Sequence, residues 1–586
     1  MAIKPAPVPS LYECSVTAVA KYYNYFKRDL RDLPETILFD VYMNLYNQNK
    51  SCILVVEFGD LDVFSKLLKI TNSRVMLIKC FQALQCHGTS LAYDLAQSYK
   101  IKAFYCQEKY CVSLKDSTID IGIRLGGFLI DTGWFLESIT VLTKCKELCL
   151  TLADNLPAWK KILECCHKLL HAETIYSQFD TAILTKKLAE ETVQKLKRSG
   201  EHLCFAGIYT QFSIHAFYLS NYQLAYEWSA MAVQELSPNS CSRVTVETLS
   251  QASKSCVVKR EFRLAQALVR LAVYLAGETF GHQHLKYADA LRDYGFYLLN
   301  SDSMKDSVTV YQKALKLKKA IYGDKNLHVA ALKEDLAYAL YVHEYSSGRF
   351  NTASHHASQA IETFSKLLPE GHLMLASAHR VKALILEEIA LDHMSQYMET
   401  QSKLLGEAER LHQNALRLCL AAFGEDNVQT AKHYGNLGRL YQSMKKYQEA
   451  EQMHLKAIEI KERLLGPDDY EVGLSVGHLA SLYNYHMEEY RKAEKLYFRS
   501  INISLKLFSE TYSGLEYDYR GLVHVYTHLG EMENAHDYKV TIDRWKTLRE
   551  EHESKERAPL EHHEPSCSLA TIQESMMNVE RPLLLP

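Results

Sequence analysis

The sequence has few of the residues that interrupt regular structure, because its 586 residues include only 12 Pro and 24 Gly. Flexible and extended linkers are rich in these residues, so most of the chain is expected to form regular elements. No run of about 18 uncharged apolar residues occurs, which predicts that no segment spans a membrane. The N-terminal stretch also lacks the apolar core of a signal peptide, so an intracellular protein is expected.

The chain also lacks a charge excess and the common catalytic motifs. With 67 basic and 70 acidic residues the net charge is −3, so nothing favours nonspecific binding to nucleic acid or acidic lipid. The 15 Cys are an odd number without regular spacing, which is typical of buried, reduced thiols. P-loop, GxGxxG, GxSxG and CxxC motifs are absent. The sequence therefore indicates a non-catalytic protein that needs no cofactor.

Two groups of potential metal ligands occur, and neither is interpreted as a metal site. Cys165, Cys166 and His167 are consecutive on a helical stretch, where neighbouring side chains diverge by about 100°, so packing in the core is favoured. The EHHE segment from Glu561 to Glu564 lies in the tail and could bind a metal only adventitiously. No metal site is predicted.

The chain does contain a repeat with a period of about 42 residues. LGRLYQSMKKYQEAE, LASLYNYHMEEYRKAE and LVHVYTHLGEMENAH begin at Leu437, Leu479 and Leu522. Leu, Tyr and Ala recur at the offsets of a tetratricopeptide repeat (TPR), where small residues let two helices approach and larger ones fill the groove. The predicted fold class is all-α, a TPR-like α-solenoid, and such arrays usually bind other molecules.

A second element recurs between the helical pairs. FGHQHLKYA, YGDKNLHVA, FGEDNVQTA and LGPDDYEVG begin at Phe280, Tyr322, Phe423 and Leu465. The Gly of each copy can end a long second helix, and an Asn or acidic residue opens the next helix in most copies. We expect roughly eight or nine pairs within residues 116–548. The charge-rich tail, residues 549–586, is expected to be disordered.

The N-terminal residues 1–50 lie outside the repeat, and residues 51–115 form a helical region that joins the array. Leu11, Ser15 and Val19 share one face of a short helix. Pro34 opens a second helix, whose face carries Ile37 and Val41. These helices could simply cap the first apolar face of the solenoid.

The same residues resemble the elongin-binding box and cullin-2 box of cullin-RING ligase substrate receptors. The first box reads small-Leu-x-x-x-Cys-x-x-x-aliphatic, and Ser15 stands here where Cys is usual. The second reads aliphatic-Pro-x-x-aliphatic-x-x-x-aliphatic and is matched throughout. The resemblance implies elongin binding by Leu11, Ser15 and Val19, and cullin binding by Leu33, Pro34, Ile37 and Val41.

Long strings such as LPETILFDVYMNLY, LGGFLIDTGW, QTAKHYGNLGRLYQSM and SGLEYDYRGL resemble the amyloid protein-binding protein 2 family, whose repeats are related to kinesin light chains. The resemblance implies a substrate receptor of a cullin-2 RING E3 ubiquitin ligase. Its partners would be elongin B/C, cullin-2 with its RING subunit, and substrate C-terminal peptides that contain Arg and Gly. The resemblance also implies binding to the amyloid precursor protein tail, and association with microtubules and membranes, in cytoplasm and nucleus. A transport or sorting adaptor is therefore the alternative, and a homodimer is left open.

The ligand is expected on the concave surface, which the first helix of each pair forms. A Glu-Asp pair suits an Arg, and an Asn beside Lys and Arg suits a carboxylate. Alternatively, these charges pair within the array. The candidate peptide-binding residues are Glu334, Asp335, Arg380, Lys432, Asn436 and Arg439.

Overall fold

The computed structural model describes residues 10–85, 88, 90–108, 112–345, 347–392, 398–554, 567–577 and 579. In this part of the chain all regular structure is helical, in 28 α-helices. None of these helices is long and apolar enough to cross a membrane. The predicted all-α class is confirmed.

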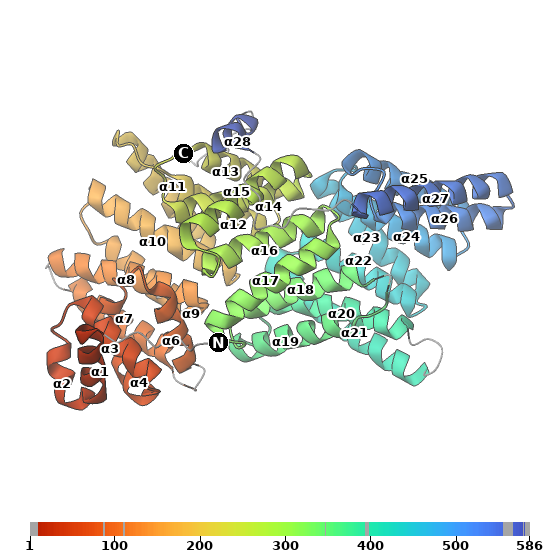
Figure 1. Ribbon diagram of the computed structural model, residues 1–586. Helices are drawn as coiled ribbons and strands as arrows, with labels where there is room; N and C mark the ends of the chain where they lie inside the picture. The colour runs from red at the N-terminus through yellow and green to blue at the C-terminus, as the bar shows by residue number, and fades with distance from the viewer. Residues whose placement is uncertain are drawn as a thin grey trace.

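Seven helices precede the repeats at the N-terminal end (Figure 1). They are α1 (Leu11–Lys21), α2 (Tyr23–Leu30), α3 (Glu35–Asn47), α4 (Ser51–Gly59), α5 (Leu61–Leu67), α6 (Arg74–Gln85) and α7 (Leu91–Glu108). Helix α3 contacts α1, α4, α5 and α6, and its Leu38, Tyr42 and Leu45 are fully buried. The N-terminal bundle is therefore organised around α3, and α7 joins it to the first repeat.

Ten helical pairs follow in the described residues, and each packs on its neighbours along the chain. The pairs are α8 (Val112–Thr132) with α9 (Phe135–Cys149), α10 (Leu156–Ile175) with α11 (Phe179–Arg198), α12 (Ala206–Tyr218) with α13 (Tyr222–Gln234), α14 (Ser242–Val258) with α15 (Phe262–Phe280), α16 (Leu285–Asn300) with α17 (Met304–Tyr322), α18 (Leu327–His343) with α19 (Asn351–Leu367), α20 (Met374–Asp392) with α21 (Met398–Phe423), α22 (Val428–Ser443) with α23 (Tyr447–Leu465), α24 (Tyr470–Tyr485) with α25 (Tyr490–Leu507), and α26 (Gly514–Leu529) with α27 (Met532–Ser554). The predicted TPR-like solenoid is confirmed.

The number of pairs exceeds the predicted eight or nine. The pair α10/α11 fills its core with Cys165, Cys166 and Leu169. These residues pack well but do not reproduce the Leu and Tyr pattern of a TPR. The two cysteines are fully buried, which agrees with their predicted role in the core.

Small residues bring the two helices of a pair together, as the template predicts. A Cβ at Gly126 of α8 would lie 2.4 Å from Leu142 Cγ of α9, so the close approach requires Gly unless Leu142 moves. Ser138 Oγ donates to Gly126 O at 2.9 Å. Ser307 and Gly295 repeat this bond between α17 and α16, also at 2.9 Å. The crossing positions are therefore fixed by packing and by a hydrogen bond.

Pairs five apart in the chain contact each other through their loops. Asn326, the N-cap of α18, accepts from His328 N at 2.8 Å and donates from Nδ2 to Thr132 O at 2.8 Å, 194 residues earlier. Asn427, the N-cap of α22, likewise caps its own helix and donates to Leu219 O at 3.1 Å, 208 residues earlier. One superhelical turn thus takes five pairs, α8/α9 to α16/α17, and the second turn lies on the first.

Two further polar contacts join the turns at the corresponding loops. His372 Nε2 lies 3.2 Å from Tyr176 O, at the end of α10. Ser513 donates to the Asp302 carboxylate from its backbone N at 2.9 Å and from Oγ at 2.6 Å. Backbone carbonyls and loop carboxylates of the first turn are therefore satisfied by residues that precede helices of the second turn.

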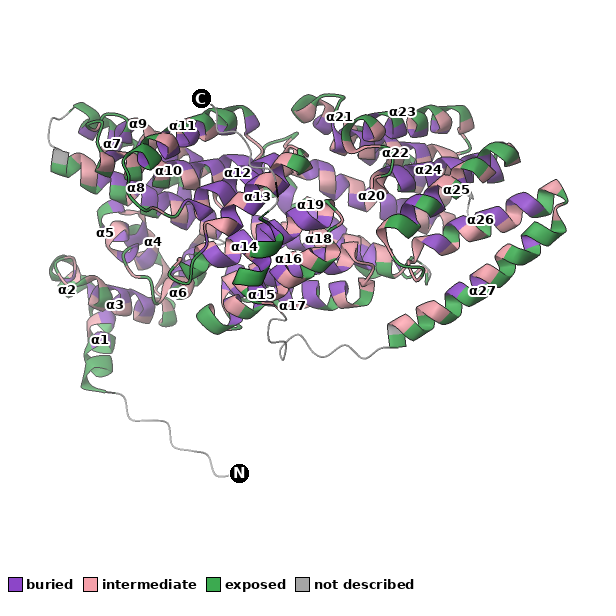
Figure 2. Ribbon diagram, turned by 90° about the horizontal axis from the view of Figure 1, so that it is seen from above, coloured by how far each residue is buried: buried purple, intermediate pink, exposed green. Residues whose placement is uncertain are grey.

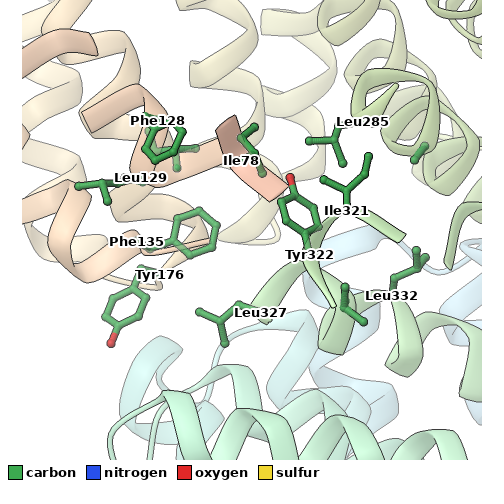
Figure 3. Packing of buried hydrophobic residues seen from close by; sticks show 14 of the residues in the cluster. Ile78, Phe128, Leu129, Phe135, Tyr176, Leu285, Ile321, Tyr322, Leu327 and Leu332 are labelled. Atoms are coloured by element: carbon green, nitrogen blue, oxygen red, sulfur yellow. The ribbon is translucent and has the colours of Figure 1, made fainter. Parts of the chain in front are cut away.

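Apolar and cation–π contacts complete this junction. At the corresponding place before α24 the N-cap is Asp469, which, unlike Asn, cannot donate a hydrogen bond when ionised. The contact across the junction is instead a cation–π contact, in which the Arg260 guanidinium lies 4.7 Å from the centroid of the Tyr470 ring. Phe135 lies near Leu327 across the junction (Figure 3). We call the following contacts the seam: Thr132–Asn326, Tyr176–His372, Leu219–Asn427, Arg260–Tyr470 and Asp302–Ser513.

The tail differs from the expectation of disorder after residue 548. Helix α27 continues to Ser554, and a short helix, α28 (Leu569–Ser575), packs against α13 and α15. Ile572 and Met576 are each 1% exposed. Composition alone suggests a solvated tail, but this segment has two apolar side chains at helical spacing and an apolar surface to receive them.

Candidate functional site

The two superhelical turns line a partly open cavity of about 1480 Å³. First helices from α8 to α22 supply most of its lining, and the lining begins at Leu68. The prediction that first helices form the concave surface is confirmed for the described residues. No described residue within helices α1 to α5 lines the cavity, so the box-like helices and the cavity are separate regions of the chain.

Alternating charges run along one wall of the cavity. Asp131 of α8 pairs with Arg243 of α14 at 2.8 Å, and Arg243 also pairs with Glu247 at 3.3 Å. Glu247 in turn accepts from Lys286 of α16. Burial alone would raise the pKa of Asp131, but Arg243 and Arg74 lower it overall. These carboxylates therefore stay ionised, and the wall is neutralised internally.

Glu334, Asp335 and Arg380 all line the cavity. Asp335 is paired with Arg292 at 2.5 Å, and the Arg380 guanidinium lies 4.8 Å from the centroid of the Tyr338 ring. Burial, and secondly the Asp335 carboxylate, raise the pKa of Glu334 to about 7. An incoming cation would stabilise the ionised form of Glu334. This part of the wall is thus suited to a guanidinium or ammonium group.

Two cations in the cavity were not predicted from the sequence. Arg124 of α8 and Lys168 of α10 line it, and neither has a carboxylate within 4.0 Å among the described residues. Lys168 lies over Gly127, where a Cβ would be 3.5 Å from its Nζ. Both residues belong to degenerate repeats, so only a comparison of equivalent first-helix positions could have identified them. They can accept a carboxylate.

Lys432, Asn436 and Arg439 of α22 are not among the described residues that line the cavity. Lys432 pairs with Glu471 of α24 at 3.3 Å, and that carboxylate raises the pKa of Lys432. The Asn436 Nδ2 is buried without a hydrogen-bond partner among the described residues. A role of Asn436 in peptide binding stays a prediction.

Arg439 is held by an internal network. Its Nη2 donates to Glu387 Oε2 at 2.9 Å, and its Nη1 donates to Tyr341 Oη at 3.0 Å. Glu387 is 1% exposed and also accepts from Ser443 Oγ at 2.8 Å. Removing the guanidinium would leave a buried carboxylate without its cation. The structure thus gives Arg439 a stabilising role, and its contact with a peptide stays a prediction.

The first N-terminal helix, α1, rests on α3 and exposes its opposite face. Val16 and Ala20 are buried, and Tyr12 Oη donates to Asp40 Oδ2 at 2.6 Å. Leu11 is 85% exposed, at the outer end of the helix, where a capping box fixes the first turn. In Figure 2, α1 projects from the body of the molecule.

The other box residues have different surroundings. Ser15 is exposed, with its Oγ donating to Leu11 O at 2.8 Å, and Val19 is half-buried. Pro34 is exposed at the N-cap of α3. Leu33 and Ile37 are half-buried, and Val41 is 1% exposed. Leu11, Ser15 and Pro34 are thus directly accessible to a partner, whereas Val41 is a core residue of α3.

The described residues contain no group of three or more His, Cys, Asp or Glu side chains that could hold a metal ion. His167 lines the cavity, and burial lowers its pKa to about 3. It is therefore neutral at physiological pH. The EHHE segment, Glu561 to Glu564, lies outside the described residues.

Comparison with protein families identifies the same repeat. A family model described as tetratricopeptide repeat matches residues 390–463. Among solved structures, a Rap protein complexed with competence and sporulation factor is similar at a TM-score of 0.49 and 13% identity, covering 66% of this chain and 98% of that one. An IFIT1 monomeric mutant with Gppp-AAAA has a TM-score of 0.40 and 14% identity, covering 73% and 90%. These structures are too distant to support an argument about ligands.

Two curated relatives are much more similar. Amyloid protein-binding protein 2 of Mus musculus is 48% identical over 541 residues, which cover 92% of each chain. The Rattus norvegicus protein of the same name is 48% identical over 576 residues, which cover 98% of each chain. Similarity at this level spans the N-terminal helices as well as the repeats. The chain belongs to the amyloid protein-binding protein 2 family.

Proposed function

We propose that the chain is the substrate-recognition subunit of a cullin-2 RING E3 ubiquitin ligase. The observation that carries the proposal is the placement of the two box-like segments. Helices α1 and α3 pack side by side, outside the cavity, and Leu11 and Pro34 are both accessible. One end of the chain is therefore free to bind elongin B/C and cullin-2 with its RING subunit while the cavity holds a substrate.

The proposed ligand is the C-terminal peptide of a substrate, with an Arg and a Gly. A chain end carries a terminal carboxylate, which an internal segment lacks, so it can use both the acidic and the basic part of the cavity wall. The wall at Glu334 and Asp335 can receive the Arg side chain, and Arg124 and Lys168 can receive the terminal carboxylate. Gly at the terminus would let the peptide backbone approach the wall closely.

Co-purification with elongin B/C and cullin-2 tests the docking part of the proposal. Leu11→Asp should abolish recovery of both partners, because it places a charge in the centre of the proposed apolar contact. Tyr25→Asp is the matched control, since Tyr25 is 84% exposed and lies outside the box residues. The proposal fails if Leu11→Asp retains elongin B/C, or if Tyr25→Asp loses it equally.

A peptide-binding assay tests the cavity independently. A fluorescent peptide that ends in an Arg- and Gly-containing sequence should bind wild type, and Glu334→Gln should weaken binding about tenfold, since a charge-assisted hydrogen bond is lost. Glu516→Gln is the control, because Glu516 forms a surface pair with Arg520. Equal affinities for wild type and Glu334→Gln would exclude this wall as the Arg subsite.

An adaptor for transport or sorting is the second candidate, and the name of the two relatives supports it because it states that they bind an amyloid protein. In this alternative the cavity or the outer surface binds the cytoplasmic tail of the amyloid precursor protein and links it to microtubules. Leu11→Asp would then leave both cargo binding and cargo turnover unchanged. The turnover measurement separates the two candidates.

A further inference from the structure

The C-terminal helix α28 is held by specific contacts far from its neighbours in the sequence. Gln573 Nε2 donates to Val233 O and to Leu236 O, both at 2.9 Å. Gln234 Nε2 donates back to Gln573 O at 2.6 Å. Figure 1 shows α28 beside α13 and α15, in the first superhelical turn, well away from α27. These bonds join residues that are 337 to 340 positions apart.

The length of α13 explains why a groove exists at this place. Helix α13 has 13 residues, whereas the second helices on either side, α11 and α15, have 20 and 19. Helix α13 is therefore shorter than its neighbours by nearly two turns. At the end of α13, Leu236 N donates to Val233 O at 3.2 Å. Gln573 adds a second donor at Val233 O and supplies a donor to Leu236 O.

Apolar side chains of α28 fill the same groove. Ile572 and Met576, four residues apart on one face, are each 1% exposed. Leu569 and Cys567 are half-buried against the main core. Glu574, on the other side of α28, is exposed. The groove thus selects a short helix with apolar residues at i, i+3 and i+7 and a Gln at i+4, as in Leu569, Ile572, Gln573 and Met576.

We propose that the groove between α13 and α15 is a docking site for a short amphipathic helix, and that residues 567–577 of the same chain occupy it as a reversible clasp. The clasp starts from α27, the last helix of the second superhelical turn, and binds α13 in the first turn. In this proposal the covalent continuity of the chain tethers the last pair, α26/α27, to the first turn and so steadies the seam contact nearest the tail, Asp302 with Ser513. The clasp limits fraying of the last pairs.

The test uses the full chain with its own clasp disabled. Ile572→Asp places a charge at a fully buried position of α28 that is not among the residues lining the cavity. This chain should capture a fluorescein-labelled peptide of residues 565–580, whereas wild type should not, because its groove is already filled. A peptide carrying Gln573→Ala should bind about tenfold more weakly, and a peptide carrying Glu574→Ala should bind like the unmodified one.

Hydrogen exchange tests the effect of the clasp on the seam. In the Ile572→Asp chain, amides around Asp302 and Ser513 should exchange at least tenfold faster than in wild type, and a Glu574→Ala chain should match wild type. The proposal is overturned if the disabled chain does not capture the peptide, or if its seam exchanges at the wild-type rate. It is also overturned if wild type is a dimer and Ile572→Asp a monomer, because the segment would then dock on a second copy.

Discussion

Replacing Asn326 by Asp should weaken the contact between the two superhelical turns while leaving the cap of α18 in place. The Asp carboxylate can still accept from His328 N, as the Asn amide oxygen does at 2.8 Å. It cannot donate to Thr132 O, which Asn326 Nδ2 reaches at 2.8 Å. Asn326 is 3% exposed, so the substitution also places a carboxylate against a carbonyl oxygen in a buried site.

The expected loss follows from these two effects. A buried hydrogen bond contributes about 1 kcal/mol, and an unsatisfied or repelled buried group adds about 1 to 3 kcal/mol, so Asn326→Asp should cost about 2 to 4 kcal/mol. Asn221→Asp is the control, because Asn221 caps α13 by accepting from Leu224 N and the structure gives its side chain no bond across the seam. Asp caps as well as Asn, so the control should change stability by less than about 0.5 kcal/mol.

Native-state hydrogen exchange of the amides near Gly133 and in the first turn of α18 measures the local free energy of opening for both variants. Urea unfolding reports whether the loss is also global. If Asn326→Asp and Asn221→Asp have the same opening free energy, the bond across the seam does not hold the turns together. The inference that the recurring Asn both caps its own helix and binds the neighbouring superhelical turn would then be wrong.

Three other predictions concern packing, buried charge and pH. Gly126→Ala should destabilise the chain by about 1 to 3 kcal/mol in urea unfolding, because its Cβ would lie 2.4 Å from a side-chain carbon. Gly406→Ala is the control: a Cβ there has no neighbour within 4 Å, so this variant should stabilise the chain by about 0.5 to 1 kcal/mol. Arg439→Gln should cost about 3 to 5 kcal/mol because it leaves buried Glu387 without its cation, and a wild-type unfolding midpoint would contradict this. Burial lowers the pKa of His454 to about 3. Below pH 6.5 the unfolded chain therefore binds a proton at this residue that the folded chain does not. Between pH 7 and pH 5, His454 should lower the free energy of unfolding by about 2 kcal/mol. A His454→Gln chain should lose that part of the pH dependence, and an unchanged pH profile would refute the assignment.

The repeat pattern was sufficient to predict the solenoid and the local caps. Asn326 and Asn427 cap their helices as predicted. Their second role could not be predicted, because it depends on which loop lies one superhelical turn away. That distance is set by small rotations between successive pairs, which no local pattern encodes. The seam, and with it the cavity, is therefore a property of the assembled array.

The candidate site shows the same limit. Glu334, Asp335 and Arg380 line the cavity because exposed positions on first helices point inward, a rule that follows from the repeat register. Lys432 and Arg439 occupy similar positions, but carboxylates on neighbouring helices bind them. Pairing between helices depends on side-chain geometry rather than on the sequence of one helix. The tail was likewise predicted to be disordered, because its sequence alone does not reveal the groove that binds α28.

The most direct test of the proposed function is reconstituted ubiquitin transfer with elongin B/C, cullin-2 and its RING subunit. The substrate is a protein that ends in an Arg- and Gly-containing peptide. The account predicts transfer with wild type and with Tyr25→Asp, and loss of transfer with Leu11→Asp. Absence of transfer with wild type, or transfer that Leu11→Asp leaves unchanged, would contradict it.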